Sequence, residues 1–261
     1  MRVTFITQDD PLYILPFFDS LLNRDLGKIE ISAIFACRPM GNRKRSKLVA
    51  ELLRLYGPVG FAKLAGIQFA KRAASALRIS RISKTAHSLG ELASLRGIPY
   101  HPITNPNAAE NFQAIASFDP EVLVSVACPF ILKRPLLQMP KRAAINIHHA
   151  PLPRYKGMMP TFWQMYHGEK AAGITIHTMA ESVDAGKIIY QQAVPIIPSE
   201  TMHDLIRRSK REGATAMLQV LKQFATDAQL DEIQPSAEST YFTFPTADEM
   251  RSFRQRGLRA I

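Results

Sequence analysis

The fold is decided by two stretches, EVLVSVA at residues 121–127 and AAINIH at residues 143–148. Both are short apolar runs rich in β-branched residues, a pattern typical of strands that are buried on both faces. Further strands are predicted at 2–7, 29–36 and 100–103, and helices between them at 11–23, 85–96 and about 107–118. Because strands alternate with helices, we expect an open, mostly parallel α/β sheet of Rossmann-like type with helices on both faces.

The pattern changes after residue 173. GITIHTM at 173–179 and KIIYQQAVPI at 187–196 predict two strands joined by a polar loop that contains glycine. A long amphipathic helix is predicted at 201–225, and a short strand and a basic helix in the tail at 239–261. We therefore expect a main domain at 1–195 and a small C-terminal helix and strand appendage at 196–261.

The positive charge is concentrated in one segment. The chain carries a net charge of +11, and residues 38–84 alone contain 12 Lys or Arg and one acidic residue, Glu51. A compact α/β unit needs only a short connection at this point, which indicates an insertion. A basic segment favours phosphate-bearing partners or an anionic membrane surface.

The cell compartment is predicted from three features. The two cysteines, Cys37 and Cys128, fit no spacing rule for pairing and are expected to be reduced. The N-terminal sequence lacks the pattern of a secretion signal, and no apolar run reaches the roughly 20 residues that span a bilayer. We expect a cytoplasmic protein, at most peripheral to a membrane.

One group of polar residues suggests chemistry. Asn146 and His148 are two residues apart on a predicted strand and therefore share a face. They lie at its C-terminal end, where open α/β sheets bind ligands. An amide and an imidazole can both donate hydrogen bonds to an oxygen that becomes negative, and His148 can also exchange a proton. Asp184, in the loop between the two late strands, can set the charge state of the histidine.

Four linked motifs give this group a context: Asn146-Ile147-His148, Leu152-Pro153-Arg154-Tyr155-Lys156-Gly157, Gly173-Ile174-Thr175-Ile176-His177 and Asp184-Ala185-Gly186. In this order they resemble the folate-dependent formyltransferases, the family of methionyl-tRNA formyltransferase, glycinamide ribonucleotide transformylase and the amino-sugar N-formyltransferases. The resemblance is clear over residues 120–195. It departs at His149-Ala150, where the family has Gly or Pro and then Ser. His149 is expected to face away from His148 and to be structural.

The resemblance implies an activity and its residues. Asn146, His148 and Asp184 would be catalytic in formyl transfer from 10-formyltetrahydrofolate to an amine, with no metal and no covalent intermediate. The donor's pterin would lie against main chain of the loop before Asp184, at Val183, and of Pro129, Phe130, Ile131 and Leu132. His177 is expected to be structural, as is Cys128.

The acceptor is left open between several classes. The first loop (Gln8, Asp9 and Asp10) and the loop Arg154, Tyr155, Lys156 and Gly157 are expected to contact it. Enzymes that act on glycinamide ribonucleotide hold its phosphate in the first loop. Two carboxylates in the first loop of this chain would repel a phosphate and argue against that acceptor. The short C-terminal part argues against tRNA. An amino sugar, either free or linked to a nucleotide, remains. The alternatives are a hydrolase of the same donor and a non-catalytic basic module that binds a membrane or nucleic acid.

The basic insertion allows three interpretations. Residues 59–79 place apolar residues near helical spacing, with Lys63, Lys71 and Arg72 partly on other faces. Such a helix can pack its apolar stripe on the domain, can lie on anionic lipid, or can hold the anionic part of an acceptor. The histidines show no metal-ligand spacing, and the Gly-x-Gly-x-x-Gly pattern of nicotinamide enzymes is absent after the first strand.

Overall fold

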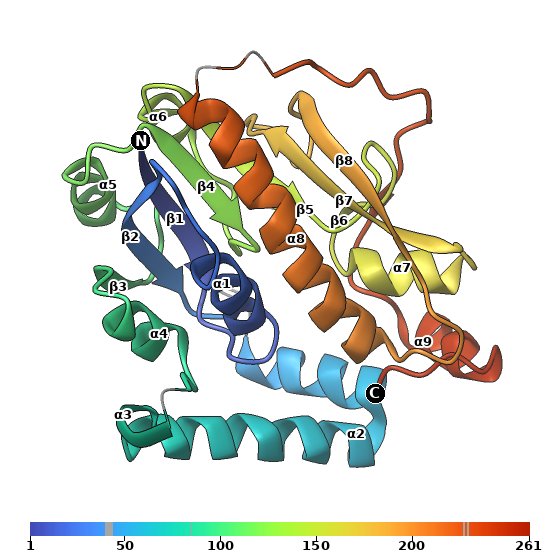
Figure 1. Cartoon of the computed structure of the whole chain (residues 1–261). Helices are drawn as coiled ribbons and strands as arrows, with labels where there is room; N and C mark the ends of the chain where they lie inside the picture. Colours follow the sequence, from blue (N-terminus) through green and yellow to red (C-terminus); the bar gives the residue numbers. More distant parts are fainter. Residues whose placement is uncertain (40–43, 84, 227, 229) are drawn as a thin grey trace.

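The structure is a computed structural model, and it describes residues 1–39, 44–83, 85–226, 228 and 230–261. Within these residues seven strands form one sheet in the order β3-β2-β1-β4-β5-β7-β8 (Figure 1). The strands are β1 (Arg2–Gln8), β2 (Glu30–Cys37), β3 (Tyr100–Ile103), β4 (Val122–Val126), β5 (Ala143–His148), β7 (Ala171–Thr178) and β8 (Ile188–Pro195). The first five are parallel, and β7 and β8 are antiparallel. The predicted mostly parallel open sheet is confirmed.

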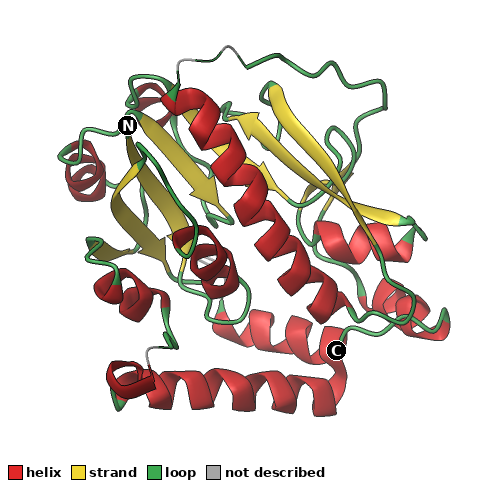
Figure 2. Ribbon diagram, viewed as in Figure 1, coloured by secondary structure: helices red, strands yellow, loops and turns green. Residues whose placement is uncertain are grey.

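The alternation of side chains along the strands builds a core on each face of the sheet. Val3 and Phe5 pack on the face that is covered by helices α1 (Ile14–Leu22), α4 (Leu89–Leu95) and α8 (Met202–Ala225). Ile6 packs on the opposite face, which is covered by α5 (Ala109–Ala116) and α6 (Arg134–Gln138). Figure 2 shows these helices on both sides of the sheet, as the sequence pattern predicted.

The late elements follow the expected order. β7 and β8 form the predicted antiparallel pair, and α8 runs across the sheet beside α1 (Figure 1). The structure thus places the first helix of the predicted 196–261 appendage against the sheet, because its apolar face joins the core there. Past it, β9 (Tyr241–Phe242) pairs with β6 (Lys156–Gly157), and α9 (Ala247–Gln255) packs near α7 (Pro160–Tyr166).

Two helices begin later than predicted, and a side-chain hydrogen bond to the backbone accompanies each shift. The first was expected from Pro11, but α1 begins at Ile14, because Asp10 Oδ1 accepts hydrogen bonds from the backbone N–H of Leu12 (2.8 Å) and Tyr13 (3.3 Å) in the turn before it. The second was expected from residue 85. There Ser88 accepts the N–H of Glu91, so α4 begins at Leu89.

The basic insertion contains α2 (Arg45–Ala76) and the short α3 (Ser80–Ser83); its residues 40–43 and 84 lie outside the described residues. Gly57, with φ of 69°, and Pro58 break α2 into two rods. Leu55 of the first rod is buried in a cluster with Phe253 and Ala260, so the insertion packs on the C-terminal segment. No helix in the described part of the chain has the length and apolar character needed to cross a bilayer.

Candidate active site

Asn146 and His148 lie on the face of β5 opposite to α8. Ile145 and Ile147 alternate with them and enter the core beneath α8. His149, one residue further, lies near Gly213 of α8, where a Cβ on the glycine would come within 3.0 Å of the ring. The expected opposite orientation of His148 and His149 is therefore seen. Burial holds the pKa of His149 well below its usual value, so this ring is neutral.

The two ring nitrogens of His148 have different partners. Nε2 lies 2.8 Å from the carbonyl oxygen of Tyr155, and because a carbonyl can only accept, Nε2 carries a proton. Nδ1 lies 3.5 Å from Asp184 Oδ2, and both side chains are about nine-tenths buried. In the neutral ring Nδ1 therefore carries no proton, and its lone pair faces the Asp184 carboxylate. That arrangement leaves Nδ1 free to take a proton.

Asp184 is held in place by its own loop. Its Oδ2 accepts the backbone N–H of Gly157 (3.0 Å), and its Oδ1 lies 3.7 Å from Nε2 of His177. Burial raises the pKa of Asp184, but the two histidines and the Gly157 N–H more than offset this and bring it to about 2. Gly186 allows the loop to turn back here, because a Cβ at this position would lie 1.6 Å from the carbonyl oxygen of Thr178. The aspartate is thus ionised at neutral pH.

His177 joins this group, although its sequence pattern suggested only a structural residue. Its Nδ1 donates to the Thr178 carbonyl oxygen (2.8 Å), which leaves Nε2 to accept from the Asn146 amide, 3.1 Å away. These two bonds orient Asn146 so that its amide nitrogen points along the same face as His148. The signal was present in the sequence, because His177 ends the Gly-Ile-Thr-Ile-His motif and faces Asn146 across the β5–β7 ladder.

Opposing effects set the charge of His148. Burial lowers its pKa below the usual value, while Asp184 and the Tyr155 carbonyl oppose this decrease. The ring is therefore neutral near pH 7 and close to a carboxylate that stabilises its protonated form. This geometry suits a group that accepts a proton at Nδ1 and then donates from Nδ1 to a developing negative charge.

The predicted donor-binding residues lie in two loops on the same side. Residues Pro129, Phe130, Ile131 and Leu132 follow β4, and Asn107 holds this loop by donating to Ile131 O (2.9 Å) and accepting from Lys133 N (2.8 Å). Ile131 is 60% exposed and Val183 is 37% exposed. Phe130 and Met179, from the start of the second loop, pack on one apolar cluster. The two loops therefore each present an exposed apolar side chain.

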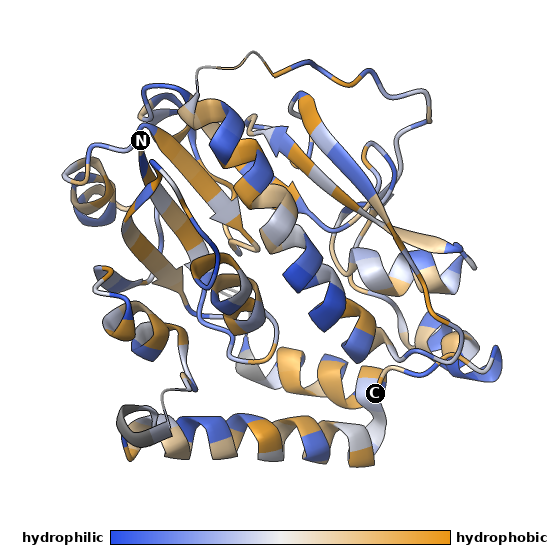
Figure 3. Cartoon of the chain, in the orientation of Figure 1, coloured by the Kyte–Doolittle hydropathy of each residue, from blue (hydrophilic) through white to orange (hydrophobic). Residues whose placement is uncertain are grey.

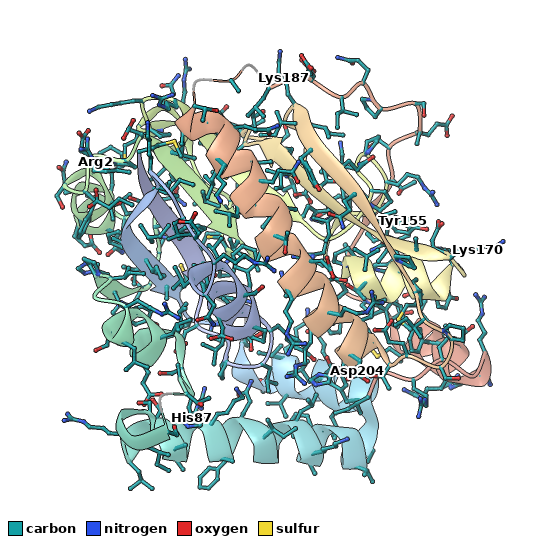
Figure 4. All side chains as sticks on the ribbon, in the orientation of Figure 1. Arg2, His87, Tyr155, Lys170, Lys187 and Asp204 are labelled. Atoms are coloured by element: carbon teal, nitrogen blue, oxygen red, sulfur yellow. The ribbon has the colours of Figure 1, made fainter. Side chains whose placement is uncertain are left out.

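The predicted acceptor-binding residues are placed in two groups. Gln8 ends β1, and Asp9 and Asp10 follow it. In the second loop, Arg154 pairs with Glu169, and the Tyr155 hydroxyl donates to the same carboxylate (2.6 Å). Figure 4 labels Tyr155 beside β7 and β8. Tyr155 and Gly157 contact the His148 and Asp184 group through their backbone, and Lys156 pairs with Tyr241 in the small sheet.

Basic side chains surround the first loop, which sequence reasoning did not predict. Lys210 of α8 is only 8% exposed, and among the described residues it makes no ion pair or side-chain hydrogen bond. Burial lowers its pKa to about 8, opposed by the nearby Asp10. Burial, followed by the charge of Arg207, lowers the pKa of Lys71, and Asp10 again opposes this. The loop's carboxylates therefore lie in a positive environment.

The start of α1, the first rod of α2 and the start of α8 meet close to these basic side chains. The Tyr13 hydroxyl lies 2.9 Å from His203 Nδ1 and 3.2 Å from the Tyr56 hydroxyl. Figure 4 labels Asp204 at the N-terminal end of α8, where that helix approaches α2. Part of the basic insertion thus reaches the edge of the candidate site.

The described residues contain no group of His, Cys, Asp or Glu arranged to hold a metal ion. The two cysteines, which fit no spacing rule for pairing, lie at the end of β2 and just after β4, and both thiols are free. They share a hydrogen bond that lowers the pKa of Cys37.

Comparisons with known proteins identify the family of this chain. The family model "Formyl transferase" matches residues 65–221. Methionyl-tRNA formyltransferase from Trichlorobacter lovleyi is 31% identical over 151 residues, which cover 58% of this chain and 48% of that protein. This chain therefore spans about half the length of the curated relative it matches.

Solved structures share the fold. A sugar N-formyltransferase from Shewanella sp. superposes with a TM-score of 0.59 at 18% identity, over 97% of this chain and 87% of that one. A glycinamide ribonucleotide transformylase from Symbiobacterium toebii gives 0.59 at 18% identity, over 89% and 91%. Since the family model covers more than half of the residues, this chain belongs to the formyl transferase family.

Proposed function

We propose that this protein transfers the formyl group of 10-formyltetrahydrofolate to a primary amine of a small molecule. The observation that carries the proposal is the convergence of Asn146, His148 and Asp184, from β5 and a loop 36 residues later in sequence, on one buried position. A structural histidine and aspartate would not need an amide oriented beside them by a second histidine. Membership of the formyl transferase family supports the same assignment.

The proposed reaction uses one proton-accepting nitrogen and one amide. The neutral amine attacks the formyl carbon, and a new carbon–nitrogen bond forms as the carbonyl oxygen becomes negative. The Asn146 amide donates a hydrogen bond to this oxygen. His148 Nδ1 takes a proton from the attacking nitrogen, and Asp184 stabilises the resulting imidazolium. The bond between the formyl carbon and N10 of the folate then breaks, and N10 receives the proton.

The donor is proposed to bind between the two loops described above. Its pterin would lie on the exposed Ile131 and Val183 side chains and make hydrogen bonds to the main chain of the 129–132 loop. Asn107 holds that loop through both its amide oxygen and its amide nitrogen. The bound ring would bring N10 and its formyl group toward Nδ1 of His148.

For the acceptor we propose an amino sugar that carries a phosphate or diphosphate group. Lys210 supports this choice. It is buried and makes no ion pair among the described residues, and a buried cation without an ion pair is destabilising unless a ligand supplies the charge. Lys71, which lies close to Arg207, interacts with the same Asp10 as Lys210 and adds positive charge on this side of the loop. The Asp10 carboxylate accepts hydrogen bonds from the backbone N–H of Leu12 and Tyr13 and interacts with Lys210, so the first loop repels a phosphate less than its sequence suggests.

The test is tetrahydrofolate release from 10-formyltetrahydrofolate, with a panel of phosphorylated amino sugars, nucleotide-linked amino sugars, glycinamide ribonucleotide and methionyl-tRNA. We expect release that depends on an amino-sugar phosphate. Release dependent on another acceptor would correct the acceptor alone, and release without any acceptor would indicate a hydrolase.

Substitutions then test the assigned residues. His148→Ala is expected to lower kcat by roughly 10²–10⁴-fold and Asn146→Ala by about 10²–10³-fold. His87→Ala, in the link before α4 (labelled in Figure 4), is the matched control and should keep full activity. Unchanged activity in both site variants would refute the mechanism.

A further inference from the structure

The second rod of α2 carries its apolar side chains outward. On a helix that packs against a protein core, the apolar stripe normally faces the core. Here the exposed side, which we name the outer face of α2, consists of Val59, Ala62, Ala65, Gly66, Phe69, Ala70, Ala76 and Leu77. Val59 is 83%, Phe69 75% and Leu77 74% exposed. Figure 3 shows hydrophobic segments along this rod at the lower edge of the molecule.

The side turned toward the protein is partly polar. Lys71 is half-buried near Arg207, and the Ser75 hydroxyl lies 3.0 Å from that of Ser88 at the start of α4. Gly60 and Leu64 provide the close apolar packing, with Gly60 against Ile261. The sequence left open whether the apolar stripe packs on the domain. In the structure most of it does not, so a surface of large exposed apolar side chains remains uncovered.

Cations flank this outer face. Lys63 and Arg78 are exposed beside it, and among the described residues their side chains make no ion pair. Arg72 is also exposed but interacts electrostatically with Asp9 of the first loop. The sequence from 52 to 90 contains no Asp or Glu. An apolar stripe between rows of cations is the pattern of helices that lie in the interface of an anionic bilayer.

We propose that the outer face of α2 docks this protein on an anionic membrane surface. Phe69, Leu77 and Val59 enter the boundary between headgroups and acyl chains, while the flanking cations meet anionic headgroups. A second copy of the chain fits less well, because pairing two outer faces would bring like charges together. The Gly57-Pro58 break and the packing of Gly60 on Ile261 fix the rod to the body. Docking would hold the cationic edge of the candidate site close to the membrane.

The experiment measures co-sedimentation of the whole protein with vesicles. We expect binding to vesicles of equal parts phosphatidylglycerol and phosphatidylcholine, little binding to phosphatidylcholine alone, and release as salt is raised. Phe69→Gln with Leu77→Gln should weaken binding by about tenfold or more. Ile197→Gln, at a residue 53% exposed elsewhere on the surface, is the matched control and should bind normally.

Charge is tested in the same way. Lys63→Glu with Arg78→Glu should lose most of the binding, whereas Lys28→Glu with Lys222→Glu, which changes the net charge equally at exposed sites elsewhere, should keep it. Formyl transfer to a soluble acceptor verifies that each variant is folded, and it does not depend on docking.

Three outcomes would overturn the proposal. The first is that the unaltered protein does not bind anionic vesicles at low salt. The second is that the variant with Phe69→Gln and Leu77→Gln binds these vesicles as well as the unaltered protein does. The third is that the unaltered protein forms a stable dimer and this variant does not. The last outcome would assign the outer face to a second copy of the chain.

Discussion

At the scale of single residues, the charge of His148 controls the proposed reaction. Burial keeps its pKa below 6.5, so Nδ1 is a free base at neutral pH and is lost as a base when the pH falls through that pKa. We predict that kcat/KM declines on the acid side below pH 6.5. In Asp184→Asn the carboxylate that raises this pKa is gone, so the acid limb should move to lower pH while kcat falls by roughly 10²-fold or more.

The pH profile of kcat/KM tests this directly. Glu181→Gln, an exposed carboxylate in the same loop, removes one negative charge and should leave the limb unmoved. An acid limb that stays in place in Asp184→Asn would mean that the aspartate does not act through His148.

Lys210 provides a second prediction at this scale. With a pKa of about 8, it loses its charge as the pH rises through that value, so KM for a phosphorylated acceptor should increase above pH 8. Lys210→Met should raise that KM by roughly tenfold at pH 7 and abolish the alkaline increase. The exposed Lys222→Met on the same helix is the control. An equal rise in KM for an acceptor without phosphate would reject anion binding by Lys210.

The sequence predicted part of this site, for a definite physical reason. Asn146 and His148 share a face by strand periodicity alone, so their proximity was readable locally. The contacts of Asp184 and His177 are made between distant segments, and only the motif order hinted at them. The charge of Lys210 was hidden because the helical pattern of 201–225 shows which residues are apolar but not which polar residue becomes buried.

At the scale of elements, the loop between β7 and β8 must approach the sheet closely to deliver Asp184. A Cβ on Gly186 would overlap the Thr178 carbonyl oxygen at 1.6 Å, so Gly186→Ala must displace the loop. We predict a loss of about 1–3 kcal/mol in the free energy of unfolding together with a large fall in kcat. Urea denaturation and steady-state kinetics measure the two effects.

Gly66→Ala is the matched control for that substitution. It lies in a helix, and a Cβ there meets nothing within 4 Å, so it should stabilise the protein by up to about 1 kcal/mol. Normal kcat in Gly186→Ala would show that the loop tolerates displacement and that Asp184 needs no fixed position.

Element positions were predicted where the pattern is local and missed where it depends on neighbours. The strands at 121–127 and 143–148 agree with β4 and β5 to within a residue or two, because continuous apolar runs have few alternatives. Helix starts moved where Asp10 formed a hydrogen-bonded turn before α1 and where Ser88 capped α4. The orientation of α2 could not be predicted, since helical spacing identifies an apolar stripe but not the side of the helix that the rest of the chain covers.

At the scale of the whole molecule, the insertion and the C-terminal segment support one another. Phe253 of α9 is 1% exposed and stacks on Phe162 of α7 with ring centroids 4.8 Å apart, in the cluster that also buries Leu55 of α2. These three segments are far apart in sequence and share one core (Figure 1). The rod that carries the outer face therefore contacts both the C-terminal segment, where Gly60 packs on Ile261, and the sheet domain, where Ser75 lies 3.0 Å from Ser88.

A pair of phenylalanine substitutions separates stability from docking. Phe253→Ala leaves a cavity in the shared core and should lower the free energy of unfolding by about 3–5 kcal/mol. Phe69→Ala removes a ring that is 75% exposed, so stability should change by less than about 0.5 kcal/mol while vesicle binding weakens. Thermal unfolding and vesicle co-sedimentation of both variants measure these effects. If Phe69→Ala destabilised the protein as much as Phe253→Ala, the outer face of α2 would be part of a core and could not be a membrane-docking surface.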